Sequence, residues 1–305
     1  MARFVAKRSR VGELRPSQVL YTYGVGAIID LPNLSAMVMG VDDWEPLSCQ
    51  TIYEPRLMEA VQRQLGAQVG RLVSPPAPPE EEAAYRQPLD AVSLVGVPVA
   101  SFPRWLRCPL CNFLGPISCG VFELKADPFR PEKTRYLHSS CRHAGGKTPP
   151  TALAARFLTA CEAGHLDDFP WAEYAHRGAP CARPELLLRE LGGSGEAADI
   201  EVRCVVCEAA RRMVDAFDSE EGMVSFPCTG RRPQLRDYEA DKPCKLRRRA
   251  ILLGASNSWF AMTLSALSLP TRTDELDELV TTHWAVLKEV DEVGVVRFMR
   301  KRGEL

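Results

Sequence analysis

The sequence contains no long hydrophobic segment. None of its 305 residues lies in an uninterrupted apolar run of about 18 residues, which is the length that a membrane-spanning helix needs. The N-terminus also lacks the apolar core of a signal peptide. We therefore predict a cytoplasmic protein, with neither membrane insertion nor secretion.

The sequence also lacks the glycine-rich loops that hold nucleotides. The glycines at 24–26 have no third glycine at the spacing of the dinucleotide fingerprint. Gly-Lys-Thr at 146–148 resembles the end of a phosphate-binding loop, but that loop needs a glycine where Cys141 stands. Pro149 and Pro150 then follow, and neither has the N–H group that would hold a phosphate. We therefore expect no ATP hydrolysis by this chain.

No strong excess of either charge is present. The chain has 38 Lys and Arg residues against 39 Asp and Glu residues, which gives a formal net charge of -1. A role in nucleic-acid binding would therefore depend on a local basic surface. The densest basic run is Arg247, Arg248 and Arg249. We predict that these arginines bind nucleic acid, with a solvated surface as the alternative.

Cysteine, in contrast, is plentiful. The chain has 11 cysteines, and four of them form two C-x2-C pairs. In a reducing compartment such pairs favour metal ligation over disulfides, and zinc is the metal that most often uses them. We predict two structural zinc ions, each held by four protein ligands.

The first predicted zinc site begins with a sequence typical of a zinc knuckle, in which two thiolates lie on a tight turn. Its other half should follow downstream. The predicted ligands are Cys108, Cys111, Cys141 and His143. Two alternatives for the fourth ligand are His138 and Cys119.

The second predicted zinc site follows a hairpin. Residues 184–191 and 199–204 have the pattern of two strands joined by a glycine-rich turn. The predicted ligands are Cys204, Cys207, Cys228 and Cys244. A third set is an alternative metal site, and it consists of Cys161, His165, His176 and Cys181.

The central stretch at 155–171 combines a thiol, an imidazole and two adjacent carboxylates. Its first half predicts a helix over 151–161 that Gly164 stops. Three interpretations of the polar cluster remain open. The side chains of Asp167 and Asp168 satisfy backbone donors, or Cys161 and His165 help to bind a metal, or His165 and the carboxylates form a catalytic metal site of a nuclease or hydrolase.

The rest of the chain predicts a mixture of short elements. We expect a short strand at 37–39, a helix at 55–65, a short helix at 209–217 and a helix from Thr273. Residues 74–88 are rich in Pro and Glu and predict a flexible loop. The predicted fold is an irregular, zinc-stabilised α+β structure with short β-hairpins. Its predicted parts are an N-terminal α+β segment at 1–100, a cysteine-rich region at 101–250 and a strand and helix segment at 251–305.

Several stretches together resemble the DrmB family, whose members are accessory subunits of the DISARM bacterial phage-defence system. The resemblance is to the N-terminal half of longer proteins and covers nearly the whole chain. One stretch runs from Ala155-Arg156-Phe157 to Trp171, and its part from Gly164 to Trp171 is the most specific. The other stretches are Arg15-Pro16-Ser17-Gln18, Tyr23 to Ala27, Asp30-Leu31-Pro32, Pro103-Arg104-Trp105-Leu106 before Cys108, Gly254 to Asn257 and Ser265 to Ser268.

The resemblance implies a protein without a catalytic centre of its own. It implies a partner, the superfamily 2 helicase of the DISARM system (DrmA), and engagement of phage DNA together with that helicase. The missing phosphate loop agrees with this expectation. The rival hypotheses are the metal-dependent nuclease or hydrolase described above and a zinc-ribbon regulator of transcription.

Overall fold

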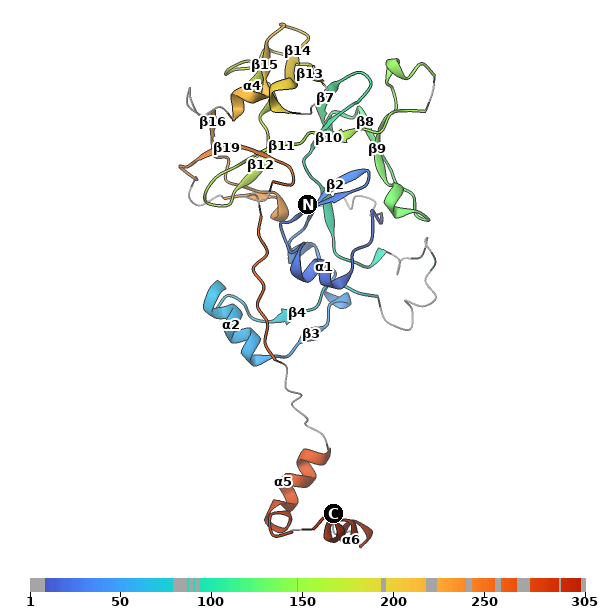
Figure 1. Ribbon diagram of the computed structural model, residues 1–305, viewed down its shortest axis with the longest axis vertical. Helices are drawn as coiled ribbons and strands as arrows, with labels where there is room; N and C mark the ends of the chain where they lie inside the picture. Colours follow the sequence, from blue (N-terminus) through green and yellow to red (C-terminus); the bar gives the residue numbers. More distant parts are fainter. Residues whose placement is uncertain are drawn as a thin grey trace, which may run out of the picture. The chain divides into compact units, whose positions relative to one another are not determined.

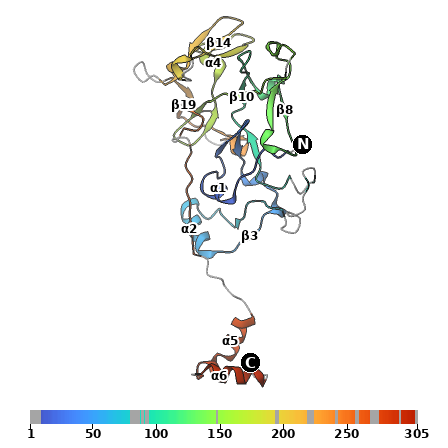
Figure 2. The same ribbon diagram turned by 45° about the vertical axis from the view of Figure 1, so that its right-hand side comes forward.

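The computed structural model describes two compact units (Figures 1 and 2). Unit 1 comprises residues Met1–Ile52 and Arg71–Thr263, and unit 2 comprises Tyr53–Gly70 and Leu264–Leu305. The residues that the structure describes are 9–78, 87, 90, 94–146, 148–192, 196–217, 224–239, 243–255, 259–267, 275–290 and 292–302. Most of the predicted loop at 74–88, Lys147 and Thr273 therefore lie outside the described residues.

Unit 1 contains several small antiparallel sheets. The three-stranded sheet has the order β1-β2-β5, formed by Ile28–Leu31, Leu34–Val38 and Val99–Ser101. Three further strand pairs are β3 with β4 (Thr51–Ile52 and Leu72–Val73), β8 with β9 (Phe122–Lys125 and Arg135–His138), and β17 with β18 (Arg231–Arg232 and Asp237–Tyr238). The central strand β2 is buried along its whole length, and it overlaps the strand predicted at 37–39.

A six-stranded sheet forms one side of the main core. Its order is β10-β6-β7-β13-β14-β15, formed by Leu153–Ala154, Trp105–Arg107, Phe113–Pro116, Leu186–Glu190, Ile200–Cys204 and Ala210–Arg212. Strands β13 and β14 pair antiparallel, with Leu186 opposite Cys204, which confirms the hairpin predicted from the sequence. In both strands buried residues alternate with less buried ones, as expected when one face lies on the core.

A four-stranded sheet contains the central stretch of the chain. Its order is β12-β11-β19-β16, formed by Leu166–Asp168, Phe157–Ala160, Arg247–Leu252 and Ser225–Pro227. The helix predicted at 151–161 is therefore wrong. Strand β11 pairs on both edges, and Phe157, Leu158 and Thr159 are all buried, so the apolar run of a central strand resembled one face of a helix. Gly164 has a φ of +83° in the β11–β12 turn, not at a helix end.

The helix predicted at 209–217 is only partly correct. The chain forms β15 there and then a short 3-10 helix, Met213–Ala216. Pairing of β15 with β14, in which Ala210 lies opposite Arg203, overrides the local helix propensity.

Short helices connect the strands of unit 1. In the part of unit 1 that the structure describes, the α-helices are α1 (Pro16–Tyr21) and α4 (Trp171–Ala175). The 3-10 helices are Val41–Asp43, Pro46–Ser48, Ile117–Cys119, Pro131–Lys133, Arg142–Ala144, Ala197–Asp199, Met213–Ala216 and Pro233–Leu235. Figure 2 shows α4 beside β14, and residues of the two elements contact each other. Together with the sheets they give the mixed helix and strand content predicted as α+β.

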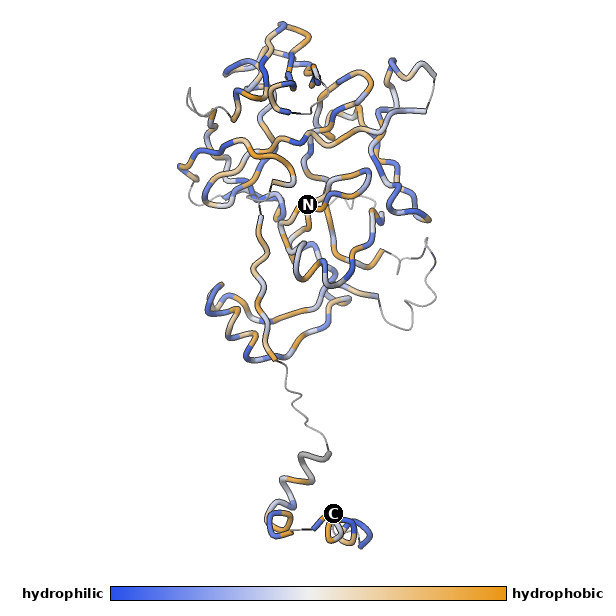
Figure 3. The backbone as a smooth tube through the Cα atoms, in the orientation of Figure 1, coloured by the Kyte–Doolittle hydropathy of each residue, from blue (hydrophilic) through white to orange (hydrophobic). Residues whose placement is uncertain are grey.

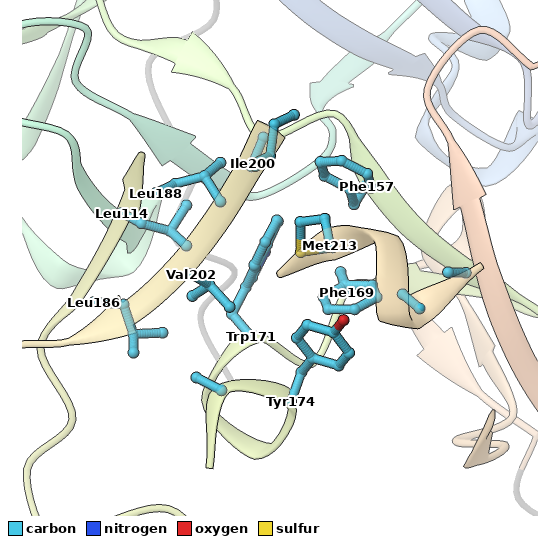
Figure 4. Packing of buried hydrophobic residues seen from close by; sticks show 14 of the residues in the cluster. Leu114, Phe157, Phe169, Trp171, Tyr174, Leu186, Leu188, Ile200, Val202 and Met213 are labelled. Atoms are coloured by element: carbon cyan, nitrogen blue, oxygen red, sulfur yellow. The ribbon is translucent and has the colours of Figure 1, made fainter. Parts of the chain in front are cut away.

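The main core is built around aromatic side chains from the central stretch (Figure 4). Phe157, Phe169, Trp171 and Tyr174 are each at most 2% exposed. The ring centroid of Phe169 lies 4.9 Å from those of Trp171 and Tyr174, within the range of favourable aromatic pairs. Because Phe169, Trp171 and Tyr174 follow Asp168 within six positions, their packing holds β12 and the two aspartates in place.

Unit 2 contains the helices α2 (Pro55–Leu65), α5 (Glu275–Leu287) and α6 (Val293–Lys301). The bounds of α2 confirm the predicted helix at 55–65, and the Glu54 carboxylate caps it by accepting from the backbone N–H of Arg56. In Figure 3 hydrophobic and hydrophilic residues alternate over short distances along the described chain. Within that part of the chain, no helix has the length and hydrophobicity needed to cross a membrane.

Candidate metal centres

Cysteine and histidine side chains gather at three places in the described chain. At each place four side chains offer ligand atoms that all lie within 4.8 Å of one another. The first group is Cys108, Cys111, His138 and Cys141; the second group is Cys161, His165, Cys228 and Cys244; the third group is His176, Cys181, Cys204 and Cys207.

The distances within the groups fit a tetrahedral metal ion. Sulfur atoms bound to zinc at about 2.3 Å with tetrahedral angles lie about 3.8 Å apart. The observed Sγ–Sγ distances are 3.8 Å for Cys108 and Cys141, 3.6 Å for Cys161 and Cys228, and 3.7 Å for Cys181 and Cys204. All 11 cysteines are free thiols. The groups therefore have the spacing of metal ligands and not the S–S separation of about 2 Å in a disulfide.

The first group joins a tight turn to the end of a neighbouring strand pair. Cys108 and Cys111 lie between β6 and β7, where the backbone N–H of Asn112 donates to the carbonyl of Cys108. His138 ends β9, and Cys141 follows it in the next turn. The Sγ atom of Cys111 lies 3.5 Å from Nδ1 of His138.

The fourth member of this group is His138, not the predicted His143. Pairing of β8 with β9 buries the His138 ring near Phe113 and Phe122, with centroids 6.0 and 5.7 Å away. His143 is exposed in the 3-10 helix Arg142–Ala144 and does not belong to the group, and neither does the exposed Cys119. Burial lowers the pKa of His138, which favours the neutral imidazole that a metal requires.

The second group closes around the β11–β12 hairpin. Cys161 and His165 lie on either side of Gly164, and the backbone N–H of Cys161 donates to the carbonyl of His165. Strand β16 leads into Cys228, and Cys244 precedes β19. Because β16 and β19 are antiparallel neighbours, the segment that follows one strand and the segment that precedes the other lie close together.

The histidine of the second group also lies next to a carboxylate, that of Glu239. Nδ1 of His165 lies 3.4 Å from the Sγ of Cys161, while its Nε2 lies 3.5 Å from Oε2 of Glu239. Histidines that bind metals commonly offer their other ring nitrogen to a carboxylate, which orients the ring. This arrangement assigns Nδ1 of His165 to the metal and Nε2 to Glu239.

The third group lies between the end of α4 and the β14–β15 turn. Nε2 of His176 is 3.1 Å from the Sγ of Cys207, and its Nδ1 is 2.6 Å from the carbonyl of Ala172. Cys204 is fully buried at the end of β14, whereas Cys207 is exposed. The backbone carbonyl thus holds the imidazole with Nε2 toward the thiols.

Some thiols of the groups have shifted pKa values. Burial raises the pKa of Cys111 to about 12, and the neighbouring thiol of Cys108 adds to the effect. Burial likewise raises the pKa of Cys228 to about 11. Burial also acts to raise the pKa of Cys204, but backbone N–H groups, those of Cys207 and Val206 first, lower it to about 6. A metal would displace the protons of the buried thiols, so binding becomes weaker as the pH falls.

Eleven of the twelve residues assigned to metals from the sequence lie in these three groups, but their grouping differs. Cys204 and Cys207 join His176 and Cys181, whereas Cys228 and Cys244 join Cys161 and His165. The number of groups is three, against the two zinc sites predicted. His138 was one of the two alternatives to His143 in the sequence, and its spacing His138-x2-Cys141, which matches Cys108-x2-Cys111, was the signal in its favour.

The two adjacent aspartates are bound by arginines. The Asp168 carboxylate accepts from the backbone N–H of Arg104 at 2.6 Å and from its Nε at 2.8 Å, and from Nη1 of Arg231 at 3.0 Å. Asp167 accepts from Arg231 and from Nη1 of Arg248, the latter at 2.9 Å. Burial lowers the pKa of Arg231, but Asp167 and Asp168 raise it by more. The guanidinium of Arg231 therefore stays charged inside the protein.

This network favours the structural interpretation of the central polar cluster. Within the described residues, neither Asp167 nor Asp168 joins a cluster of metal-ligating side chains, and His165 belongs to the second group. Both carboxylates are occupied by arginines, so the geometry offers no open metal position at these three residues.

The three arginines of the basic run are not equivalent. Arg247, Arg248 and Arg249 lie in β19, where successive side chains point to opposite faces. Arg248 is partly buried against Asp167, with its guanidinium 6.0 Å from the ring centroid of Phe226. Arg247 and Arg249 are exposed, and Arg247 donates to the hydroxyl of Ser225 at 2.6 Å. At most two of the predicted arginines are therefore available to nucleic acid.

Comparison with known proteins agrees with the resemblance seen in the sequence. The chain is similar to the DISARM protein DrmB of Bacillus paralicheniformis (strain ATCC 9945a / NCIMB 11709 / CD-2), with 22% identity over 263 residues. The similarity covers 83% of this chain and 40% of that protein, so the chain spans less than half the length of its relative. A family model matches residues 15–260, which include all three groups. The chain belongs to the family of this model, described as a domain of unknown function, DUF8724.

Proposed function

We propose that this chain is a non-catalytic, zinc-binding accessory subunit of a DISARM-type bacterial defence complex against phages. Its partner in this proposal is a superfamily 2 helicase of the DrmA type, and DNA is engaged through the complex. The observation that carries the proposal is the similarity to a DISARM protein DrmB over 83% of the chain. The three closed groups of ligands support the accessory role.

A structural role for the metals follows from the number of ligands. Each group supplies four protein side chains, which fill the tetrahedral coordination of zinc and leave no position for a reacting water. Thiolate and imidazole ligands in these combinations are the usual ligands of structural zinc. The metals would then join segments that are far apart in the sequence, such as those of Cys161 and Cys228.

The partnership is tested by purification of the tagged full chain after co-expression with a DISARM-type helicase. We expect the helicase to be retained with the metal-loaded chain and to elute with it in size-exclusion chromatography. We expect ATP hydrolysis only in fractions that contain the helicase. Failure of the helicase to bind a folded chain with its full metal content would refute the proposed partnership. ATP hydrolysis by the chain alone would refute the non-catalytic role.

The contribution of the basic strand to DNA binding is a separate prediction. Replacing Arg247 and Arg249 together with alanine should weaken duplex binding by the complex independently of sequence. Since each lost phosphate contact reduces the salt slope by about 0.9, the double variant should reduce it by about 1.8. The slope comes from affinities measured over a series of salt concentrations.

The matched control is the double variant Arg130→Ala and Arg142→Ala, which removes two exposed arginines elsewhere in unit 1. This control should leave the slope closer to that of the unmodified complex. Arg248→Ala should act differently, by destabilising the fold, because Arg248 pairs with Asp167 inside the protein. An unchanged slope in the Arg247 and Arg249 variant, with weaker helicase binding, would place these arginines at the partner interface.

A further inference from the structure

A pocket of about 430 Å³ opens on unit 1 beside the start of β6. Pockets for small ligands typically measure about 300–1,000 Å³, so its size suits one small organic molecule. The residues that line it include Ser101, Arg104, Trp105, Ile117, Ser118 and Tyr136. They come from the end of β5, from β6 and the residue before it, from the 3-10 helix Ile117–Cys119, and from β9. None of the three groups of metal ligands contributes to the lining.

The lining combines aromatic, hydroxyl and cationic groups. Trp105 and Tyr136 supply aromatic surface, and the hydroxyl of Tyr136 lies 3.0 Å from that of Ser101. Arg104 supplies the positive charge, and none of the described lining residues is acidic. This combination fits a planar aromatic ligand that carries a negative charge.

Arg104 is held in a fixed position with part of its guanidinium left free. Asp168 accepts from both its backbone N–H and its Nε, which ties the residue at two points. The side chain of Arg104 nevertheless remains 51% exposed, and its two terminal nitrogens donate to no described residue. A guanidinium with free terminal N–H groups is well suited to bind a phosphate with two parallel hydrogen bonds.

Hydrogen bonds connect the pocket residue Arg104 to a separate stretch of the sequence that does not line the pocket. Arg104 and Trp105 belong to Pro103-Arg104-Trp105-Leu106, and Asp168 belongs to the stretch from Gly164 to Trp171. Arg104 and Asp168 are 64 positions apart in the sequence and are joined by the two hydrogen bonds described above. Asp168 is therefore a positioning residue for Arg104, in addition to its bond with Arg231.

We propose that this pocket binds one unpaired nucleotide, with its base against Trp105 and its phosphate on Arg104. The nucleotide is either part of a single strand or free in solution, since both present the same chemistry. Base stacking on aromatic side chains tolerates every base, so the site distinguishes unpaired from paired nucleotides rather than one sequence from another. A base within a duplex is stacked on both faces and cannot enter without unpairing.

This inference extends the proposed function, because it gives the chain its own contact with nucleic acid. It does not depend on the helicase. A chain that fails to bind nucleotides but retains the helicase would refute the pocket and leave the partnership intact.

The test uses the full, metal-loaded chain and two probes, a short fluorescein-labelled oligothymidylate and adenosine monophosphate. Binding of the oligothymidylate is measured by fluorescence anisotropy. Binding of adenosine monophosphate is measured by calorimetry and by its competition with the labelled oligothymidylate. Trp105→Ala should weaken oligothymidylate binding by about 10- to 100-fold, the range expected for loss of one stacked base. Ser118→Glu should weaken it by about tenfold or more, because it places a carboxylate beside Arg104.

The matched control is Ser140→Glu, which adds the same charge at an exposed position that does not line the pocket. It should bind like the unmodified chain. Ser118 is exposed, so its variant tests the proposal even if Trp105→Ala does not fold. Competition by adenosine monophosphate would show that a free nucleotide is sufficient, and binding of the oligothymidylate alone would assign the site to a strand.

Two results would overturn the proposal. One is the absence of binding of both probes to the unmodified chain at millimolar concentration. The other is a combined result: Ser118→Glu and Ser140→Glu bind the oligothymidylate with equal affinity, and the unmodified chain binds duplex DNA as tightly as the single strand.

Discussion

Replacing His138 with alanine should release one metal ion per chain and unfold the strands around the first group, whereas His143→Ala should leave the metal content unchanged. The structure places His138, and not His143, with Cys108, Cys111 and Cys141. Binding of structural zinc contributes about 10–16 kcal/mol in small zinc domains. This binding free energy is at least as large as the free energy of unfolding of a typical domain, about 5–15 kcal/mol. Metal analysis by mass spectrometry, together with thermal unfolding, measures both effects.

The same measurement separates the two possible groupings of the remaining ligands. Cys204 and Cys228 belong to different groups in the structure, although they share one predicted zinc site in the sequence. The double variant Cys204→Ser and Cys228→Ser should therefore lose two metal ions, and each single variant should lose one. Cys119→Ser is the control, since this exposed thiol belongs to no group. Loss of a single ion in the double variant would contradict the grouping, and a metal-free chain after gentle purification would contradict all three sites.

The second large effect is expected for Asp168→Ala, which should destabilise the fold by about 3–5 kcal/mol, the cost of breaking a buried ion pair. The change leaves Arg231, which is 7% exposed, with only part of its compensating charge. It also removes both bonds that hold Arg104. Denaturant unfolding with circular dichroism measures the loss.

A matched ion pair at the surface provides the control for this variant. Asp237 pairs with Arg232 at 2.8 Å, and both side chains are at least 40% exposed. Asp237→Ala should cost less than about 1 kcal/mol, since exposed pairs contribute little. Similar losses in the two variants would show that the central network is no stronger than a surface pair. It would also remove the reason to treat Asp167 and Asp168 as structural.

The candidate ligands could be predicted from the sequence because the ability to bind a metal belongs to the cysteine and histidine side chains themselves. The number of cysteines and the C-x2-C spacing indicated metal ligation without any knowledge of the fold. The exchange of His143 for His138 shows the limit of this reasoning. Both histidines are close to Cys141 in the sequence, and only the pairing of β8 with β9 determines which imidazole lies inside.

The pattern of hydrophobic residues was less informative in the central stretch. Residues 157–159 are buried because both faces of β11 are covered: Phe157 packs in the main core, and Leu158 packs in a second cluster with Met37 and Phe102. A strand buried on both faces has no alternation to distinguish it from a helix. Likewise, Arg248 looked like part of an exposed basic run. Its contact with Asp167 depends on β19 lying next to β11, which no local sequence pattern encodes.

By itself, then, the sequence determined the kind of protein: a mixed α+β chain, rich in residues that can bind metals and without a nucleotide loop, that resembles DrmB. The tertiary structure decided which residues act together. Ligands that are 67 residues apart, as Cys161 and Cys228 are, meet because antiparallel strands bring distant segments to the same end of a sheet. Strand pairing is a non-local interaction, whereas spacing and periodicity describe only neighbours along the chain. For this reason the sequence identified nearly all the ligands, and only the fold could sort them into three groups.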